Sequence, residues 1–244
     1  MRFRKKHYAV PEMQKSHYVL LNMDDFTGDW SSYFASASLP YAVELGAGKG
    51  KFLAQKAKDD PSHNYIGVDI ETNAMVFAKR NLEEAGVDNA LLLCHDISNI
   101  EGVFPKDFAD TLYIFFPNPW PKNRHNKRRL THPRQLIQYH SFLKDGANVY
   151  FKTDDTELYE DSLSYLPAMG FKILKSSSDL KVEEDPTGIV TEYEQRWRDQ
   201  GIAIKAMWAQ KEKVAPEDLR KRLEQFHLDE KAKREDYRQA HQNT

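Results

Sequence analysis

The chain has 244 residues, 40% hydrophobic and 30% charged, with a formal net charge of −2. A chain of this length can bury the core of one domain with an appendage, so it needs no disulfide or metal for stability. Cys94 is the only cysteine, which excludes an internal disulfide and a multi-cysteine zinc or iron–sulfur site. No stretch approaches the ~18 apolar residues of a membrane helix, and the basic N-terminus lacks the apolar part of a secretory signal, so we expect a cytoplasmic protein without a membrane partner.

Positive charge is concentrated in one part of this slightly acidic chain. Residues 111–144 contain no Asp or Glu but seven basic residues, which are Lys122, Arg124, Lys127, Arg128, Arg129, Arg134 and Lys144. A second basic arm lies within residues 1–22, formed by Arg2, Arg4, Lys5, Lys6 and Lys15. Because the net charge is negative, a nucleic acid would have to be bound by these local patches and not by overall basicity.

Apolar runs alternate with helical patterns along the chain. Runs at residues 41–45, 65–70, 90–94, 111–116, 148–152, 171–174 and 202–208 predict seven strands. Helices are expected over 51–58, from an N-cap at Thr72 to Gly86, and before residue 170. Another helix should begin at Thr131 and carry Leu143, with Gly146 just past its end. This order predicts an α/β fold, an open, mostly parallel, seven-stranded sheet with helices on both faces.

The C-terminal residues differ from the rest. We expect residues 1–211 to form a single domain, of which 1–38 are a basic arm and a helix. Within residues 212–244, Pro216 opens a charged helix with Leu219, Leu223 and Phe226 on a narrow apolar stripe. The stripe indicates that this extension docks on the domain surface. For its role, the favoured interpretation is a solvated extension without function.

A glycine-rich loop follows the first strand, with the sequence Glu44-Leu45-Gly46-Ala47-Gly48-Lys49-Gly50. Glycines at a strand end let the backbone approach a ligand closely. A dinucleotide-binding fingerprint would place its third glycine at position 51, which is Lys51, and would need no acid at position 44. The loop instead fits a cofactor with a cationic amino acid end and no pyrophosphate, such as S-adenosylmethionine.

Two further acids follow the next two strands. Asp69 ends the second strand, where a carboxylate can accept hydrogen bonds from both ribose hydroxyls. Asp96 follows the third strand, where an acid can accept from the adenine amino group. Because parallel strands end at one edge of a sheet, we expect both acids near Glu44. The predicted cofactor-binding residues are therefore Glu44, Gly46, Gly48, Gly50, Asp69 and Asp96.

A proline-rich loop leaves the fourth strand beside this site. Prolines at positions 117, 119 and 121 exclude a sheet ladder or a regular helix and favour a stiff extended loop. The loop should present Asn118 and Trp120 to the site before it enters the basic stretch. An amide and an aromatic ring leading into Lys and Arg suit a base that enters the site while its phosphates are held outside. Taken alone, Trp120 is more often a packing residue, and a basic run is more often a solvated face.

These motifs together resemble the bacterial tRNA (guanine-N7)-methyltransferase family. The resemblance rests on residues 44–50, 116–122 and 124–129, on Lys152-Thr153-Asp154 and on Thr191-Glu192-Tyr193-Glu194, and it extends over about residues 1–211. It implies a Rossmann-like class I methyltransferase that uses S-adenosylmethionine to methylate N7 of a guanine in the tRNA variable loop.

The resemblance also implies roles for individual positions. Glu44, Asp69, Asp96 and Asn118 match cofactor-site positions of the family. Lys122, Asp154, Thr191, Glu192, Tyr193 and Glu194 match its substrate-contact positions. We expect the tRNA backbone to be bound by Arg124, Lys127, Arg128 and Arg129 together with the N-terminal arm, through salt-sensitive contacts to phosphates. Because tertiary contacts in tRNA can occupy guanine N7, we also expect the base to be partly extruded.

One position departs from the family pattern. The family usually has Asp where this chain has Asn118, and that Asp is commonly assigned the catalytic role. Guanine N7 carries a lone pair and no proton, so its attack on a methyl group needs no general base. Our hypothesis is that Asn118 orients the reactants and that activity persists at a reduced level.

Several alternatives remain open. Asp154 could simply cap the next helix, and the acids at 192 and 194 could pair with Arg196 and Arg198. His125 has no partner cluster, so we expect no metal site there. A nicotinamide-dependent oxidoreductase is disfavoured by Lys51, whereas a non-catalytic tRNA-binding protein with a weakened site is the more serious rival because of Asn118. The sequence leaves the choice between monomer and homodimer undetermined.

Overall fold

The computed structural model describes residues 6–242, with residues 123, 233–234 and 236–242 described by their backbone alone. The strands are β1 (Val19–Leu20), β2 (Tyr41–Leu45), β3 (Asn64–Asp69), β4 (Ala90–Cys94), β5 (Ala109–Phe115), β6 (Leu143–Thr153), β7 (Phe171–Ser177) and β8 (Lys205–Lys211). The α-helices are α1 (Ala9–Met13), α2 (Lys51–Asp59), α3 (Thr72–Ala85), α4 (Pro133–Tyr139), α5 (Thr156–Ala168), α6 (Glu192–Asp199) and α7 (Pro216–Gln242). Short 3-10 helices are η1 (Met23–Asp25), η2 (Trp30–Tyr33), η3 (Ile97–Asn99), η4 (Asn123–Arg128) and η5 (Val182–Glu184).

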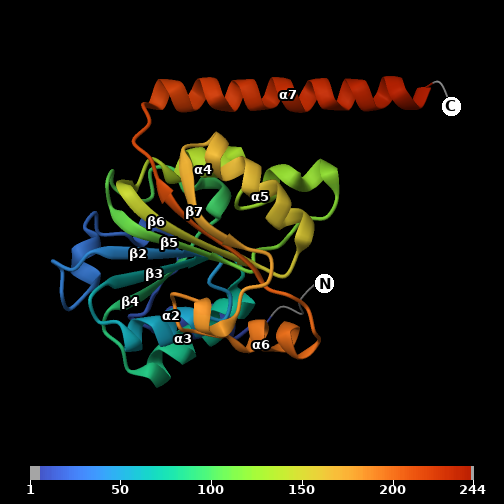
Figure 1. Cartoon of the computed structure of the whole chain (residues 1–244). Helices are drawn as coiled ribbons and strands as arrows, with labels where there is room; N and C mark the ends of the chain where they lie inside the picture. Colours follow the sequence, from blue (N-terminus) through green and yellow to red (C-terminus); the bar gives the residue numbers. More distant parts are fainter. Residues whose placement is uncertain (1–5, 243–244) are drawn as a thin grey trace.

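The strands form one sheet in the order β1-β4-β3-β2-β5-β6-β8-β7 (Figure 1). Neighbours among β1 to β6 pair in parallel, whereas β8 runs antiparallel to both β6 and β7. The predicted α/β class with a mostly parallel sheet is confirmed. The predicted count of seven strands is one too few, because β1 is a two-residue edge strand that is too short to leave a periodic pattern.

The boundary between α4 and β6 differs from the prediction. The helix expected from Thr131 begins at Pro133, because the ring of His132 accepts a hydrogen bond from a backbone N–H two residues later and proline favours the first helical turn. This helix ends at residue 139. Leu143 and Gly146 therefore lie in β6, where Leu143 pairs with β5. The last strand likewise begins at residue 205 and not at 202.

The sheet separates two hydrophobic clusters. Side chains alternate between its faces, so Ala42 and Tyr65 pack in one cluster while their neighbours Val43 and Ile66 pack in the other. Helices α2 and α3 cover one face and α4 and α5 cover the other (Figure 1). The carboxyl ends of β2 to β5 are thus held at one edge of a rigid sheet.

Helix α7 docks by its N-terminal part, as the apolar stripe predicts. Leu219 is buried, and Phe226 meets the rings of Tyr165 and His132 edge-on at centroid distances of 5.3 and 5.6 Å. The far half of the helix extends past the body of the domain (Figure 1). No helix among the described residues is long and apolar enough to span a bilayer.

The glycine loop depends on one close approach. Gly50 is the N-cap of α2 with φ of +65°, and a Cβ added there would lie 2.7 Å from Cβ of Ala78 on α3. We expect Gly50→Ala to lower the free energy of unfolding by about 2–4 kcal/mol, the sum of left-handed strain and overpacking. Gly86→Ala is the control, since Gly86 has φ of +64° with open space around it, and should lose only about 1 kcal/mol. Equal losses in urea denaturation would show that the contact with Ala78 is not the constraint.

Candidate active site

The candidate site begins at the carboxyl ends of β2 and β3. The backbone N–H groups of Gly46 and Ala47 donate to the carbonyl of Val68, at 2.8 and 3.2 Å, so the glycine loop folds back over β3. Gly46 and Gly48 have φ values of +83° and +55°, which residues other than glycine rarely adopt. The loop is therefore a bare backbone surface at the edge of the sheet.

Glu44 is the unusual group at this edge. Its side chain is 4% exposed, and its Oε2 has no hydrogen-bond partner. Burial, together with the nearby charge of Asp69, raises the pKa of Glu44 to about 8. A buried carboxylate without a partner is costly, and a cation is the group that would neutralise it.

Asp69 ties the glycine loop to the start of α3. Its Oδ2 accepts from the backbone N–H of Gly48 and its Oδ1 from that of Glu71, both at 2.8 Å. Burial raises the pKa of Asp69, which these two hydrogen bonds partly offset. Each oxygen keeps a second lone pair, so a ribose contact stays a prediction. The cap of α3 is Glu71 and not Thr72, because the Glu71 carboxylate accepts from the backbone N–H of Asn73.

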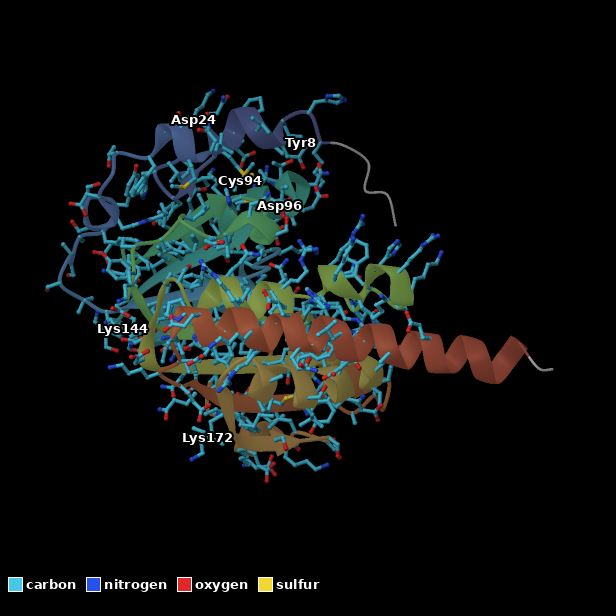
Figure 2. The ribbon with its side chains drawn as sticks, turned by 90° about the horizontal axis from the view of Figure 1, so that it is seen from above. Tyr8, Asp24, Cys94, Asp96, Lys144 and Lys172 are labelled. Carbon is cyan, nitrogen blue, oxygen red and sulfur yellow. The ribbon has the colours of Figure 1, made fainter. Side chains whose placement is uncertain are left out.

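Asp96 lies at the end of the neighbouring strand. Its side chain is exposed, and its Oδ1 accepts from the backbone N–H of Ser98 at 2.9 Å. Figure 2 places it beside Cys94, the last residue of β4, and well away from Lys144. Lys144 lies near the start of β6, so it belongs to the opposite edge of the sheet from the glycine loop. Of the acids predicted for the cofactor, Asp69 is near enough to Glu44 for its charge to raise the Glu44 pKa, whereas Asp96 is exposed and caps η3.

The proline loop carries strained backbone on both sides of Asn118. Phe116 and Trp120 have φ values of +48° and +46°, which are uncommon for bulky side chains. Asn118 is exposed, and its Oδ1 accepts from the backbone N–H of Trp120 at 3.1 Å. This side chain therefore holds the loop in shape while its amide nitrogen stays available as a donor. Trp120 packs edge-on against His125 at 5.7 Å, which agrees with the packing interpretation of this ring.

Arg129 anchors the proline loop from beneath. It is fully buried, donates from Nε to the carbonyl of Pro119 at 2.7 Å and forms ion pairs with Glu157 and Asp161 of α5. The prediction that Arg129 binds a tRNA phosphate is therefore wrong, because its guanidinium has no exposed surface and is already neutralised.

The other cations of the basic segment, which we define as residues 122–134, are exposed. Among the described side chains, no acid forms an ion pair with Arg124, Lys127 or Arg128. Arg128 lies over the ring of Trp120 at 5.0 Å. Partial desolvation, with the charges of Arg124, Arg128 and Lys122, lowers the pKa of His125. The segment is thus an uncompensated positive surface next to the proline loop.

Of the N-terminal arm, residues 1–5 lie outside the described residues, and Lys6 lies over the ring of Phe77 at 3.6 Å.

An aromatic pair joins α6 to the proline loop. Tyr193 is 41% exposed, and its ring lies 5.1 Å from that of Phe116. Thr191 caps α6 by accepting from a backbone N–H, so its hydroxyl has a structural role. Glu192 is exposed and lies 3.8 Å from Lys51.

Asp154 lies at the end of β6, beside Tyr193. Burial raises the pKa of Asp154, an effect that the Tyr193 hydroxyl partly offsets. The alternative that Asp154 caps α5 is wrong, because Asp155 is the cap and accepts from the backbone N–H of Leu158 at 2.7 Å. Asp154 thus remains a candidate for substrate contact.

A buried ion cluster holds α6 on the sheet, and the sequence did not predict it. Nζ of Lys152 lies 2.5 Å from Asp185 and 3.0 Å from Glu194, and Arg198 donates twice to Glu194, at 2.9 and 2.6 Å. Glu194 is fully buried, so the prediction that it contacts substrate is wrong, and the alternative that it pairs with an arginine is correct. A lysine in an apolar strand was the available signal, since a buried lysine requires acidic partners.

The pKa of Glu44 predicts a pH-dependent stability. A folded-state value of about 8 against an ordinary 4.5 means that the folded protein keeps a proton that the unfolded chain releases, so the stability due to this group falls as pH rises from about 4.5 to 8. Glu44→Gln should therefore stabilise the ligand-free protein, more at pH 9 than at pH 5, as measured by urea unfolding. The exposed Glu192→Gln should show no such trend, and parallel pH profiles for the two variants would disprove the assignment.

Comparison with known proteins places this geometry in a family. Residues 38–207 match the family described as "Putative methyltransferase". The chain is 42% identical over 218 residues to a tRNA (guanine-N(7)-)-methyltransferase of Clostridium perfringens (strain SM101 / Type A), which covers 86% of this chain and 100% of the relative. A protein of the same name from Clostridium beijerinckii (strain ATCC 51743 / NCIMB 8052) is 41% identical over 219 residues, or 87% of this chain and 100% of the relative.

Solved structures agree on the fold. The 16S rRNA methyltransferase KamB matches with a TM-score of 0.55 at 16% identity, over 71% of this chain and 88% of that chain. At this identity the likeness establishes only the class I methyltransferase fold, whereas the Clostridium relatives establish the family. With its glycine loop, proline loop and ion-anchored α6, the chain belongs to the tRNA (guanine-N7-)-methyltransferase family.

Proposed function

We propose that this protein transfers a methyl group from S-adenosylmethionine to N7 of a guanine in the tRNA variable loop, in the cytoplasm. The observation that carries the proposal is the buried, unpartnered Glu44 carboxylate behind a bare glycine loop. When bound there, the cofactor would supply a methyl group activated by its positively charged sulfur. The residues present fit it, since Glu44 offers a negative charge to a cationic ligand and the loop offers backbone at close range.

The remaining cofactor positions follow from the strand ends. Asp69 keeps free lone pairs toward a ribose diol, and the exposed Asp96 can accept from an adenine amino group. Gly46, Gly48 and Gly50 keep the loop free of side chains that would fill the space. In this proposal one carboxylate each would face the ammonium, the ribose and the base of such a cofactor.

The guanine side of the proposed reaction involves α6 and the proline loop. Tyr193 and Phe116 form an aromatic surface next to Asn118, on which a flat base can stack. The carboxylates of Asp154 and Glu192 are the acceptors there for guanine N1 and N2 hydrogens, since Glu194 is occupied by the buried cluster. Lys122, Arg124, Lys127 and Arg128 would bind phosphates outside the site. Thr191 would contribute by fixing the first turn of α6.

Direct transfer of a labelled methyl group tests the proposal. With S-adenosylmethionine labelled in the methyl group and unmodified tRNA, we expect label in the tRNA and chain cleavage at 7-methylguanosine within the variable loop. The reason is that the site combines a cation-binding carboxylate with a cationic rim. A protein that binds tRNA and incorporates no label would instead be the non-catalytic binding protein that Asn118 leaves open.

Asn118 gives a second test. Guanine N7 needs no proton removed, so we propose that Asn118 keeps the loop shape and orients the reactants. Asn118→Ala removes the acceptor for the Trp120 N–H and should lower kcat by about 10- to 100-fold. Asn118→Asp keeps that acceptor and adds a negative charge near a cationic product, so it should match or exceed the wild type. Turnover of Asn118→Ala equal to that of the wild type would contradict the orienting role.

A further inference from the structure

Helix α7 has no part in the proposed function, and the family match ends at residue 207, before it begins. A groove with a volume of about 460 Å³ nevertheless lies between α7 and the basic segment. We call it the tail groove. Its polar walls are formed by Arg124, Lys127, Arg134, His227, Glu230 and Lys231.

Packing of α7 on the domain fixes one wall of the tail groove. Phe226 is held edge-on between His132 and Tyr165, so this part of the helix is fixed on the domain. His227 and Lys231 are four residues apart and therefore share one face of α7. Both are exposed and line the groove. Figure 2 shows α7 running alongside the segment that carries the basic side chains.

The charges in the tail groove are mostly uncompensated. Among the described side chains, four permanent cations line it against the one carboxylate of Glu230. Within the described part of the chain, no acid pairs with Arg124, Lys127 or Arg134. The exposed Lys231 pairs with Glu235, 3.8 Å away and one helical turn on, which is a weak surface pair. A concave surface of this charge attracts a polyanion.

A second hollow extends the basic surface from the tail groove toward η3. Lys127 and Arg134 also line a hollow of about 600 Å³, whose other wall includes Ser98 and Asn99 of η3. Asp96, a predicted cofactor residue, caps η3, so this hollow lies next to the strand end that carries Asp96. Of the described residues, Lys127, Arg128 and Arg134 line this hollow together with one acid, Glu101, so cations outnumber acids from η3 to α7. An extended chain of phosphates, and not a small anion, matches two hollows that share Lys127 and Arg134.

We propose that α7 and the basic segment together bind the sugar–phosphate backbone of the RNA substrate, so that the C-terminal helix extends the tRNA-binding surface. This inference rests on the proposed function. It assigns α7 a role in affinity and none in the chemical step, because the groove lies outside the predicted cofactor and guanine contacts.

Charge reversal on α7 tests the tail groove. Lys231→Glu should raise the Kd for tRNA at least fivefold at about 0.1 M salt and reduce the slope of log K against log salt by about one. At saturating tRNA its kcat should be unchanged while KM rises. Lys221→Glu is the matched control, because Lys221 is an exposed lysine of the same helix that pairs with Asp218 at 3.3 Å and does not line the groove. Its Kd should stay within about twofold, as expected for a surface charge without a phosphate contact.

The outcomes separate the two proposals. If the wild type methylates tRNA and both variants bind equally well, the tail groove does not bind RNA and the proposed function stands. If the wild type binds tRNA without methylating it but Lys231→Glu alone weakens binding, the proposed function fails and the groove stands. A wild type that neither binds nor methylates tRNA overturns both. Helical content measured by circular dichroism confirms that α7 survives each substitution.

Discussion

A buried carboxyl group without a hydrogen-bond partner organises this molecule. Glu44 lies in the middle of the sheet, flanked by β3 and β5, and the paired backbone of these strands prevents it from turning into solvent. Asp69 on the adjacent strand adds repulsion and is itself satisfied by the glycine loop. The pKa of Glu44 is therefore held at about 8 in the ligand-free protein, and a bound cation would lower it by stabilising the ionised carboxylate.

A second set of charges is neutralised within the fold. This contrast distinguishes charges that stabilise the structure from charges that can bind a ligand. Lys152 and Arg198 neutralise Asp185 and Glu194 in the interior, and Arg129 does the same with two acids of α5. These groups fix α6 and the proline loop and leave no charge for a ligand. The exposed cations on η4 are the opposite case, since no described acid forms an ion pair with them. A charged group is therefore available for binding a ligand only where no opposite charge of the fold neutralises it.

The sequence predicted what depends on local pattern and missed what depends on distant partners. Continuous apolar runs located seven strands, and the glycine loop is visible in its local sequence, whereas the cofactor contacts of Glu44, Asp69 and Asp96 stay a prediction. Lys152 contacts acids 33 and 42 positions away, and Arg129 looked like any other member of an exposed basic run. Only the tertiary fold shows that both are buried. The α4–β6 boundary failed for a related reason, because pairing with β5, and not helical spacing, decides where Leu143 lies.

The position of β8 has a consequence for biosynthesis. Strand β8 lies between β6 and β7 although it is the last strand in the chain. During translation, β6 therefore has an open edge and β7 has no neighbour until residues 205–211 have left the ribosome. The sheet closes by late insertion, so the nascent protein exposes a strand edge that can pair with other chains. Early termination of synthesis before this strand would thus yield aggregation and not a smaller active domain.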